Sequence, residues 1–140
     1  MPFTGNYTCN TFKSGILAGS FDFAAPTSDV YKIALYNSRA TLNDETTAYT
    51  TSNEVVATGY TAGGQIITPS VGILDGISYL NFSDAVWNGR ITARGALIYK
   101  VGGSNTALFV LDFGSDKTST TQFKVQFPVA TNTSALVRIY

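Results

Sequence analysis

The side chains that most often carry out acid–base chemistry or bind metals are scarce in this chain. It has no histidine, one cysteine (Cys9) and nine acidic residues among 140. Without histidine, Ser-His-Asp and Cys-His nucleophilic catalysis and histidine-ligated zinc sites are excluded. No histidine is available to activate the thiol of Cys9, so we expect it to be a small buried residue.

A pair of carboxylates is the remaining route to catalysis, because a glycoside hydrolase needs only two. Most of the acidic residues fall at predicted turns, where carboxylates commonly hydrogen-bond to the backbone. These residues are Asp29, Asp44, Asp75, Asp84 and Asp116. Asp112 and Asp116 faintly suggest a calcium loop, but their low density of ligands favours a hairpin turn. We therefore predict no enzyme, no metal and no cofactor, with a carboxylate-based glycan hydrolase left as an alternative.

The amino-acid composition limits the classes of partner that this protein can bind. The formal net charge is zero and the sequence pI is about 6.1. Binding to nucleic acid needs an excess of Lys and Arg on one face, and binding to an anionic membrane needs a similar excess. Near-zero charge instead favours association with other protein. No apolar run reaches the roughly 20 residues that span a bilayer. The N-terminus does not resemble a signal peptide, and the single cysteine is typical of a reducing cytosol.

The elements that must position any site are predominantly strands. Apolar and polar residues alternate in segments bounded by Gly, Asn and Ser turns. The predicted strands are 30–36, 65–74 with a break near Pro69, 77–82, 91–100, 107–113, 121–127 and 135–140. A short helix is expected at 11–18. The pattern predicts a single all-β domain over residues 1–140, a jelly roll or β-sandwich of about eight strands.

Two stretches have no strand pattern. Residues 1–10 are predicted to form an N-terminal arm, and residues 37–64 form a long irregular segment rich in Thr, Ser, Asn and Gly. A loop of this length in a compact domain is usually functional. Aromatic residues are enriched at protein interfaces, and these stretches contain several. The predicted partner contacts are Phe3, Tyr7, Tyr49, Asn53, Glu54 and Tyr60.

Five segments carry a resemblance to a known family. They are YKIALY at 31–36, TTAYTTSNEV at 46–55, TGYTAGG at 58–64, ARGALIY at 93–99 and LDFG at 111–114. Together with the size of the chain, they resemble tailed-phage head-decoration (cement) proteins, such as the jelly-roll cement protein of a short-tailed Bordetella phage. The segment from 46 to 64 is the specific part. The family has no catalytic motif to transfer.

The resemblance implies a structural virion protein. It would be made in the host cytoplasm, bind the outer surface of the head and reinforce contacts between subunits of the major capsid protein, as a homodimer. The alternative is a carbohydrate- or receptor-binding module of a phage tail or fibre. In that case Trp87, Tyr49 and Tyr60 are the candidates for stacking on a sugar.

Overall fold

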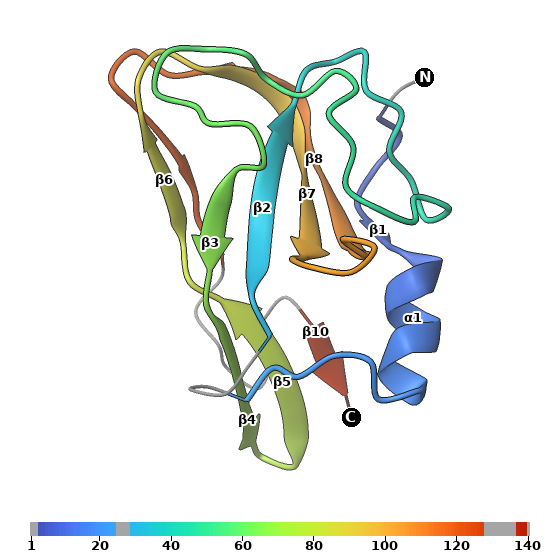
Figure 1. Ribbon diagram of the computed structural model, residues 1–140. Helices are drawn as coiled ribbons and strands as arrows, with labels where there is room; N and C mark the ends of the chain where they lie inside the picture. The colour runs from blue at the N-terminus through green and yellow to red at the C-terminus, as the bar shows by residue number, and fades with distance from the viewer. Residues whose placement is uncertain (1–2, 25–28, 128–136, 140) are drawn as a thin grey trace.

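The computed structural model describes residues 3–24, 29–127 and 137–139. In this structure, short segments of alternating apolar and polar residues form antiparallel strands along the chain. One helix, α1 (Asn10–Leu17), lies near the N-terminus. The strands in chain order are β1 (Tyr7–Thr8), β2 (Tyr31–Tyr36), β3 (Gln65–Ile67), β4 (Pro69–Leu74), β5 (Ile77–Phe82), β6 (Ala85–Asn88), β7 (Thr92–Lys100), β8 (Ala107–Thr118), β9 (Gln122–Val125) and β10 (Val137–Ile139) (Figure 1). The predicted all-β sandwich with a short N-terminal helix is confirmed.

The strands group into three antiparallel sheets, ordered β1-β8-β7-β2-β3, β10-β5-β4 and β6-β9. β2 lies between β7 and β3 and is buried on both faces. Its residues Tyr31, Ile33 and Leu35 belong to the main core, whereas Ala34 and Tyr36 belong to a second, smaller core. The alternation of side chains along a strand produces this division. The irregular segment 37–64 supplies Ala40 and Leu42 to the smaller core, so this long loop covers one face of the large sheet.

The N-terminal residues are part of the fold, which corrects the predicted arm. Tyr7 pairs with Val110 across β1 and β8, and the backbone N–H of Cys9 donates to the carbonyl of Leu108 at 2.8 Å. Phe3 is 3% exposed and packs against Gly95, where a Cβ atom would lie 2.4 Å from the Phe3 ring. A β-strand pairing and a buried aromatic ring therefore hold residues 3–9 against the sheet. The buried Cys9 agrees with the expectation from its sequence.

Strand β8 continues through the predicted turn at Gly114 and ends at Thr118. The register with β7 shifts between Gly95, opposite Asp112, and Ala93, opposite Lys117. More residues of β8 than of β7 occupy this interval, so the strand bulges. Gly114 takes a positive φ of 85° within the bulge, and its N–H donates to the carboxylate of Asp112. The sequence predicted that the strand would end at this glycine, but Gly114 instead marks a bulge within β8.

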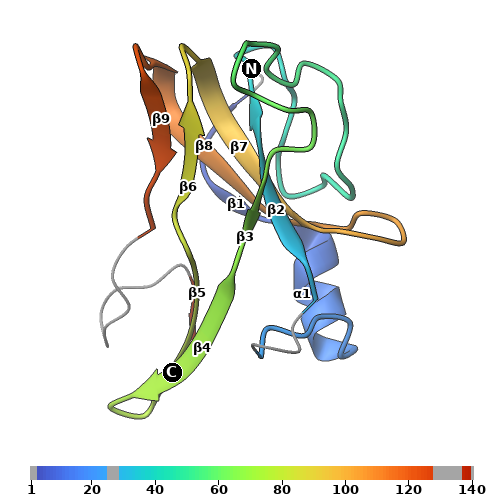
Figure 2. The same ribbon diagram turned by 60° about the vertical axis from the view of Figure 1, so that its left-hand side comes forward.

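The chain changes sheets between β3 and β4. β3 pairs with β2, whereas β4 pairs with β5, and the predicted break near Pro69 falls at this change. The turn residues Asp75 and Gly76 both have positive φ, as a two-residue type I′ hairpin requires. Figure 2 shows the β4–β5 hairpin extending beyond the end of the large sheet.

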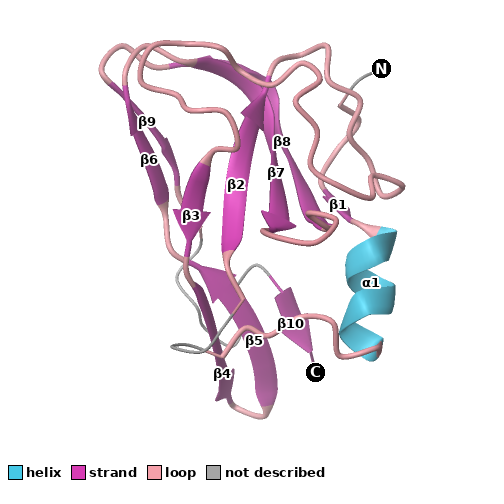
Figure 3. Cartoon of the chain, in the orientation of Figure 1, coloured by secondary structure: helices cyan, strands magenta, loops and turns pink. Residues whose placement is uncertain are grey.

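Helix α1 follows directly from β1, as Figure 3 shows. Phe12 is its one buried side chain and joins the main core. The helix begins after Cys9, which makes no side-chain cap. Gly19, with φ of 72°, lies just past the end of the helix, where glycine is common.

Candidate functional site

Glu54 accepts hydrogen bonds from three groups of the segment 37–64. The hydroxyl of Tyr49 donates to Oε1 at 2.6 Å, the hydroxyl of Tyr60 donates to Oε2 at 2.6 Å, and the backbone N–H of Gly63 donates to Oε2 at 2.8 Å. Tyr60 also accepts from the backbone N–H of Leu35 at 2.9 Å. The cluster therefore fastens the long segment to strand β2.

The electrostatics of this cluster favour a structural role. Burial raises the pKa of Tyr60, and its hydrogen bond to Glu54 raises it further. Burial, followed by the charge of Glu54, raises the pKa of Tyr99 to about 12. Glu54 is 7% exposed and Tyr60 is 9% exposed. These tyrosines stay protonated at neutral pH and the carboxylate faces protein donors, so the arrangement orders a loop and presents no acid–base pair to a substrate.

The structure separates the six predicted contact residues into buried and accessible ones. Phe3, Glu54 and Tyr60 are buried within the chain. Tyr7 and Tyr49 are half-buried, and Asn53 is exposed. Tyr49 stacks on Tyr99 with ring centroids 4.7 Å apart. The structure brings Tyr49, Glu54 and Tyr60 together, but as an internal network, so their aromatic and polar character serves the fold.

The predicted sugar-stacking side chains are not arranged as a platform. Trp87 is 1% exposed and packs against Phe123 in the main core, with ring centroids 6.3 Å apart. Its other aromatic neighbour is Tyr60, at 5.9 Å. The ring faces that would stack on a sugar are therefore covered by protein.

Of the two carboxylates that suggested a calcium loop, Asp112 has structural partners, whereas Asp116 is exposed. Asp112 accepts from Arg94 Nε at 3.0 Å and from the N–H of Gly114 at 2.8 Å. Desolvation opposes ionisation of Asp112, but these hydrogen bonds outweigh it and its pKa is lowered. Across the described ranges, no three His, Cys, Asp or Glu side chains are grouped so that they could hold a metal ion.

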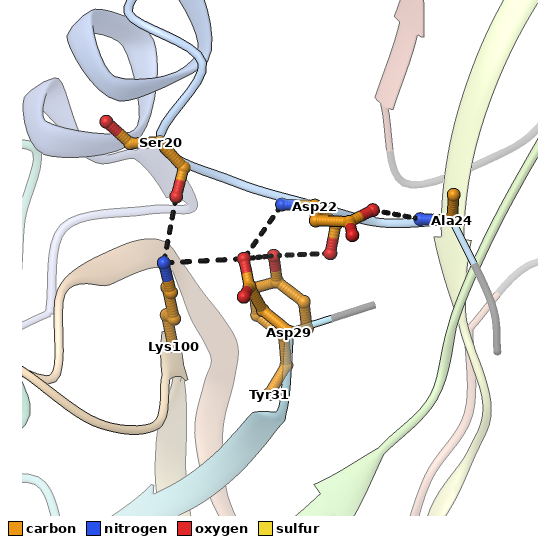
Figure 4. Close-up of polar contacts among 6 residues, drawn as sticks. All are labelled: Ser20, Asp22, Ala24, Asp29, Tyr31 and Lys100. Atoms are coloured by element: carbon orange, nitrogen blue, oxygen red, sulfur yellow. Dashed lines mark hydrogen bonds and ion pairs between the residues drawn. The ribbon is translucent and has the colours of Figure 1, made fainter. Parts of the chain in front are cut away.

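A second polar cluster joins the segment after α1 to the large sheet (Figure 4). Lys100 Nζ donates to the carbonyl of Ser20 at 2.9 Å and lies 3.3 Å from Asp29 Oδ2. The N–H of Asp22 donates to the same carboxylate oxygen at 2.8 Å, and this hydrogen bond is the main reason that the pKa of Asp29 is lowered. Tyr31 donates its hydroxyl to the carbonyl of Asp22. The cluster fixes the path of residues 20–24.

This path places two phenylalanines beside the helix. Phe21 and Phe23 lie 5.5 Å and 6.2 Å from the ring of Phe12, and Phe23 stacks on Tyr31 at 5.0 Å. The rings of Phe12 and Phe23 form part of one wall of an open cavity with a volume of about 430 Å³. Its lining is almost entirely apolar and consists of Phe12, Ile16, Phe23, Val71, Gly72, Ile73, Ser78, Tyr79, Leu80 and Val137.

The opposite wall is a sheet face that begins in the core and extends beyond it. Val71 lies directly opposite Leu80, which lies opposite Val137, and Ile73 lies opposite Ser78. Directly paired residues point to the same face of a sheet. Leu80 is 6% exposed, whereas Val71 is 51% exposed and Ile73 is 71% exposed. The same apolar face is thus covered at one end and open to solvent at the other.

We define the hairpin–helix surface as Ile16, Val71 and Ile73, which line the cavity, together with Leu17, which follows Ile16 in α1. Leu17, the last residue of α1, is 91% exposed. Scattered exposed apolar residues are ordinary, but apolar residues gathered around an open apolar cavity mark interaction sites in soluble proteins. The arrangement can bind an apolar protein surface and offers few polar groups with which to orient a small substrate.

The amino-acid sequence did not indicate this surface. Val71 and Ile73 lie in a predicted strand, and their alternation indicates one shared face without indicating whether that face is covered. The one available signal is Leu17, because it lies five residues after Phe12 and therefore about 140° around the helix from that side chain, off the stripe that Phe12 marks.

Comparison of the chain with protein-family models, with curated proteins and with solved structures found no match. Within the described residues, the helix is too short to cross a membrane.

Proposed function

We propose that this protein is a structural virion protein, which binds the outer surface of an assembled phage capsid and reinforces contacts between major capsid subunits. The observation that carries the proposal is the hairpin–helix surface, together with the cavity of about 430 Å³ beside it. The family resemblance of the segments at 31–64 supplies the class of partner. The proposed location is the outer surface of the head.

The chemistry of the hairpin–helix surface suits a protein partner. Its four residues are aliphatic, and burying an aliphatic side chain contributes roughly 1.5–3 kcal/mol relative to leaving it exposed. One such contact is weak after the costs of association are subtracted. A capsid presents the same site many times, and a bivalent protein gains roughly 10²–10⁴-fold in avidity when both sites engage. Modest apolar contacts repeated over a shell are therefore sufficient.

The described groups support a role without catalysis. The buried carboxylate of Glu54 is saturated by protein donors, and Asp112 is held by Arg94 and Gly114. The chain also has no histidine with which to move protons at neutral pH.

Substitution of Leu17 by Asp tests the proposed surface. The side chain is almost fully exposed, so the change leaves the fold intact and places a charge where an apolar partner would lie. We expect the Leu17→Asp variant to bind purified shells at least roughly tenfold more weakly than the unchanged protein. Shells stripped of the protein should rupture at lower temperature, and adding back the unchanged protein should restore them.

Val56→Asp is the matched control, because Val56 is 97% exposed and lies on a different part of the surface, beside Arg90 and Thr92. This variant should bind and stabilise shells like the unchanged protein. Equal binding by both variants would remove the hairpin–helix surface from the proposal. Stripped particles that are fully stable but fail to adsorb to host cells would replace the decoration role with the receptor-binding alternative.

A further inference from the structure

We propose that the outer edge of strand β4 pairs with β4 of a second copy of this chain, forming a two-fold symmetric dimer with a continuous antiparallel sheet. This inference identifies an interface for the homodimer that the family resemblance leads us to expect. It concerns the isolated protein and stands whether or not the protein decorates a capsid.

β4 is an edge strand. The sheet order is β10-β5-β4, and no described strand pairs with the side of β4 that faces away from β5. β4 has six residues, whereas the other edge strands of the described sheets have two to four. An exposed, apolar edge strand is a ready template for pairing with another chain.

The hydrogen bonds to β5 determine which backbone groups of β4 are directed outward. The N–H of Ser83 donates to the carbonyl of Thr68 at 2.9 Å, so position 68 faces β5. In an antiparallel ladder, hydrogen-bonded and non-hydrogen-bonded pairs alternate. Ser70, Gly72 and Leu74 therefore face β5, in agreement with the two-residue turn that follows Leu74. The N–H and C=O groups of Val71 and Ile73 face the free edge.

The outward N–H and C=O groups of Val71 and Ile73 can pair with the same groups of a second copy of the chain. When two antiparallel β4 strands are centred on Gly72, Val71 of each copy lies opposite Ile73 of the other. Both residues have outward backbone groups, so the two pairs can form four N–H···O=C hydrogen bonds. The same register sets Val and Ile side chains directly across from one another, a favourable β-branched pairing.

The lack of charge on β4 also permits pairing with a second copy of the chain. The sequence of β4, PSVGIL, has no charged residue, and the chain has zero formal net charge. Like charges directly opposite each other would destabilise a symmetric pair, and this strand contains none. By contrast, β9 carries Lys124, a residue type that natural proteins use to protect an edge.

Pairing at this edge leaves the sheet faces open. Strands add side by side within a sheet, so the apolar face with Val71 and Ile73 would become continuous between the two copies. Each copy would keep its own α1 and cavity. The dimer would then present two hairpin–helix surfaces, which is the bivalent arrangement that the capsid proposal uses.

Disulfide trapping between two different variants, each with one added cysteine, tests the register. Cα atoms of a hydrogen-bonded antiparallel pair lie about 5.5 Å apart, within the range of a disulfide. We expect a mixture of the Val71→Cys and Ile73→Cys proteins to cross-link on the order of tenfold faster than either protein alone. In either variant alone the two new thiols are diagonal neighbours, at roughly 7–8 Å or more. The native Cys9 is 0% exposed and does not compete.

Sedimentation of the unchanged protein provides the second measurement. We expect a monomer–dimer equilibrium that Ile73→Lys shifts to monomer and that Val56→Lys leaves unchanged. A monomer at all concentrations up to about 1 mM would overturn the inference. So would cross-linking as fast in the single variants as in their mixture. Because no capsid is present, either result is independent of the test of the proposed function.

Discussion

At the residue scale, Glu54 and Tyr60 show how a buried polar pair can order a long loop. Tyr60 uses its hydroxyl twice, donating to Glu54 at 2.6 Å and accepting from the N–H of Leu35 at 2.9 Å. We expect Tyr60→Phe to lower the free energy of unfolding by about 1–3 kcal/mol, because it leaves the buried N–H of Leu35 without its acceptor and removes one of the two donors to Glu54 Oε2. Urea denaturation at an unchanged m-value measures this loss.

Tyr79→Phe is the control for that substitution. The hydroxyl of Tyr79 has no hydrogen bond among the described residues, and the side chain is half-buried. Its loss should change the free energy of unfolding by no more than about 0.5 kcal/mol. Equal losses in the two variants would show that the Glu54 network contributes little to stability.

At the element scale, strand β9 gives a direct test of facing. Phe123, Val125 and Phe127 are buried, whereas Gln122, Lys124 and Gln126 are exposed, as the sequence predicted. We expect Phe123→Ala to lower the free energy of unfolding by about 3–5 kcal/mol, because it leaves a cavity beside Trp87 and Phe113.

The neighbouring change Lys124→Ala should lie within about 0.5 kcal/mol of the unchanged protein. Lys124 Nζ is 3.7 Å from Asp84 Oδ2, but both side chains are exposed, and such surface ion pairs contribute little. Thermal or chemical denaturation of the two variants provides the comparison. A larger loss from Lys124→Ala than from Phe123→Ala would contradict the facing of this strand.

At the scale of the whole molecule, the absence of histidine determines how stability depends on pH. The lowered pKa values of Asp29 and Asp112 stabilise the fold above their unfolded value of 3.8, and this contribution is lost as the pH falls through their folded values. Burial raises the pKa of Cys9 to about 11 and that of Tyr99 to about 12. Their contribution is complete below the unfolded values of 9.0 and 10.0 and is lost as the pH rises through the folded ones.

We therefore expect a nearly constant melting temperature between about pH 5 and pH 8, with losses on both sides. Differential scanning calorimetry in a series of buffers measures this profile. A distinct step near pH 6.5, the ordinary range of histidine, would contradict it, because the chain has no histidine to titrate there.

Local periodicity determined much of the fold. The alternation in residues 77–82 predicts β5 with the bounds observed, and the apolar spacing of Phe12 and Ile16 predicts α1 to within one residue. These elements follow from the sequence because the period of side chains along a strand or helix is a local property. The scarcity of side chains for acid–base chemistry and metal binding also follows directly from the amino-acid composition.

Only the tertiary structure determined which residues of the strands and of the long loop are buried and which are exposed. Glu54 and Tyr60 appeared to be loop residues available for contact, but the loop folds back over β2 and buries them. Val71 and Ile73 lie in a predicted strand whose alternation does not say which face is covered, and β4 and β5 extend past the elements that would cover them. Alternation specifies that residues share a face, whereas burial depends on segments far away in sequence. The candidate surface therefore became visible only in three dimensions.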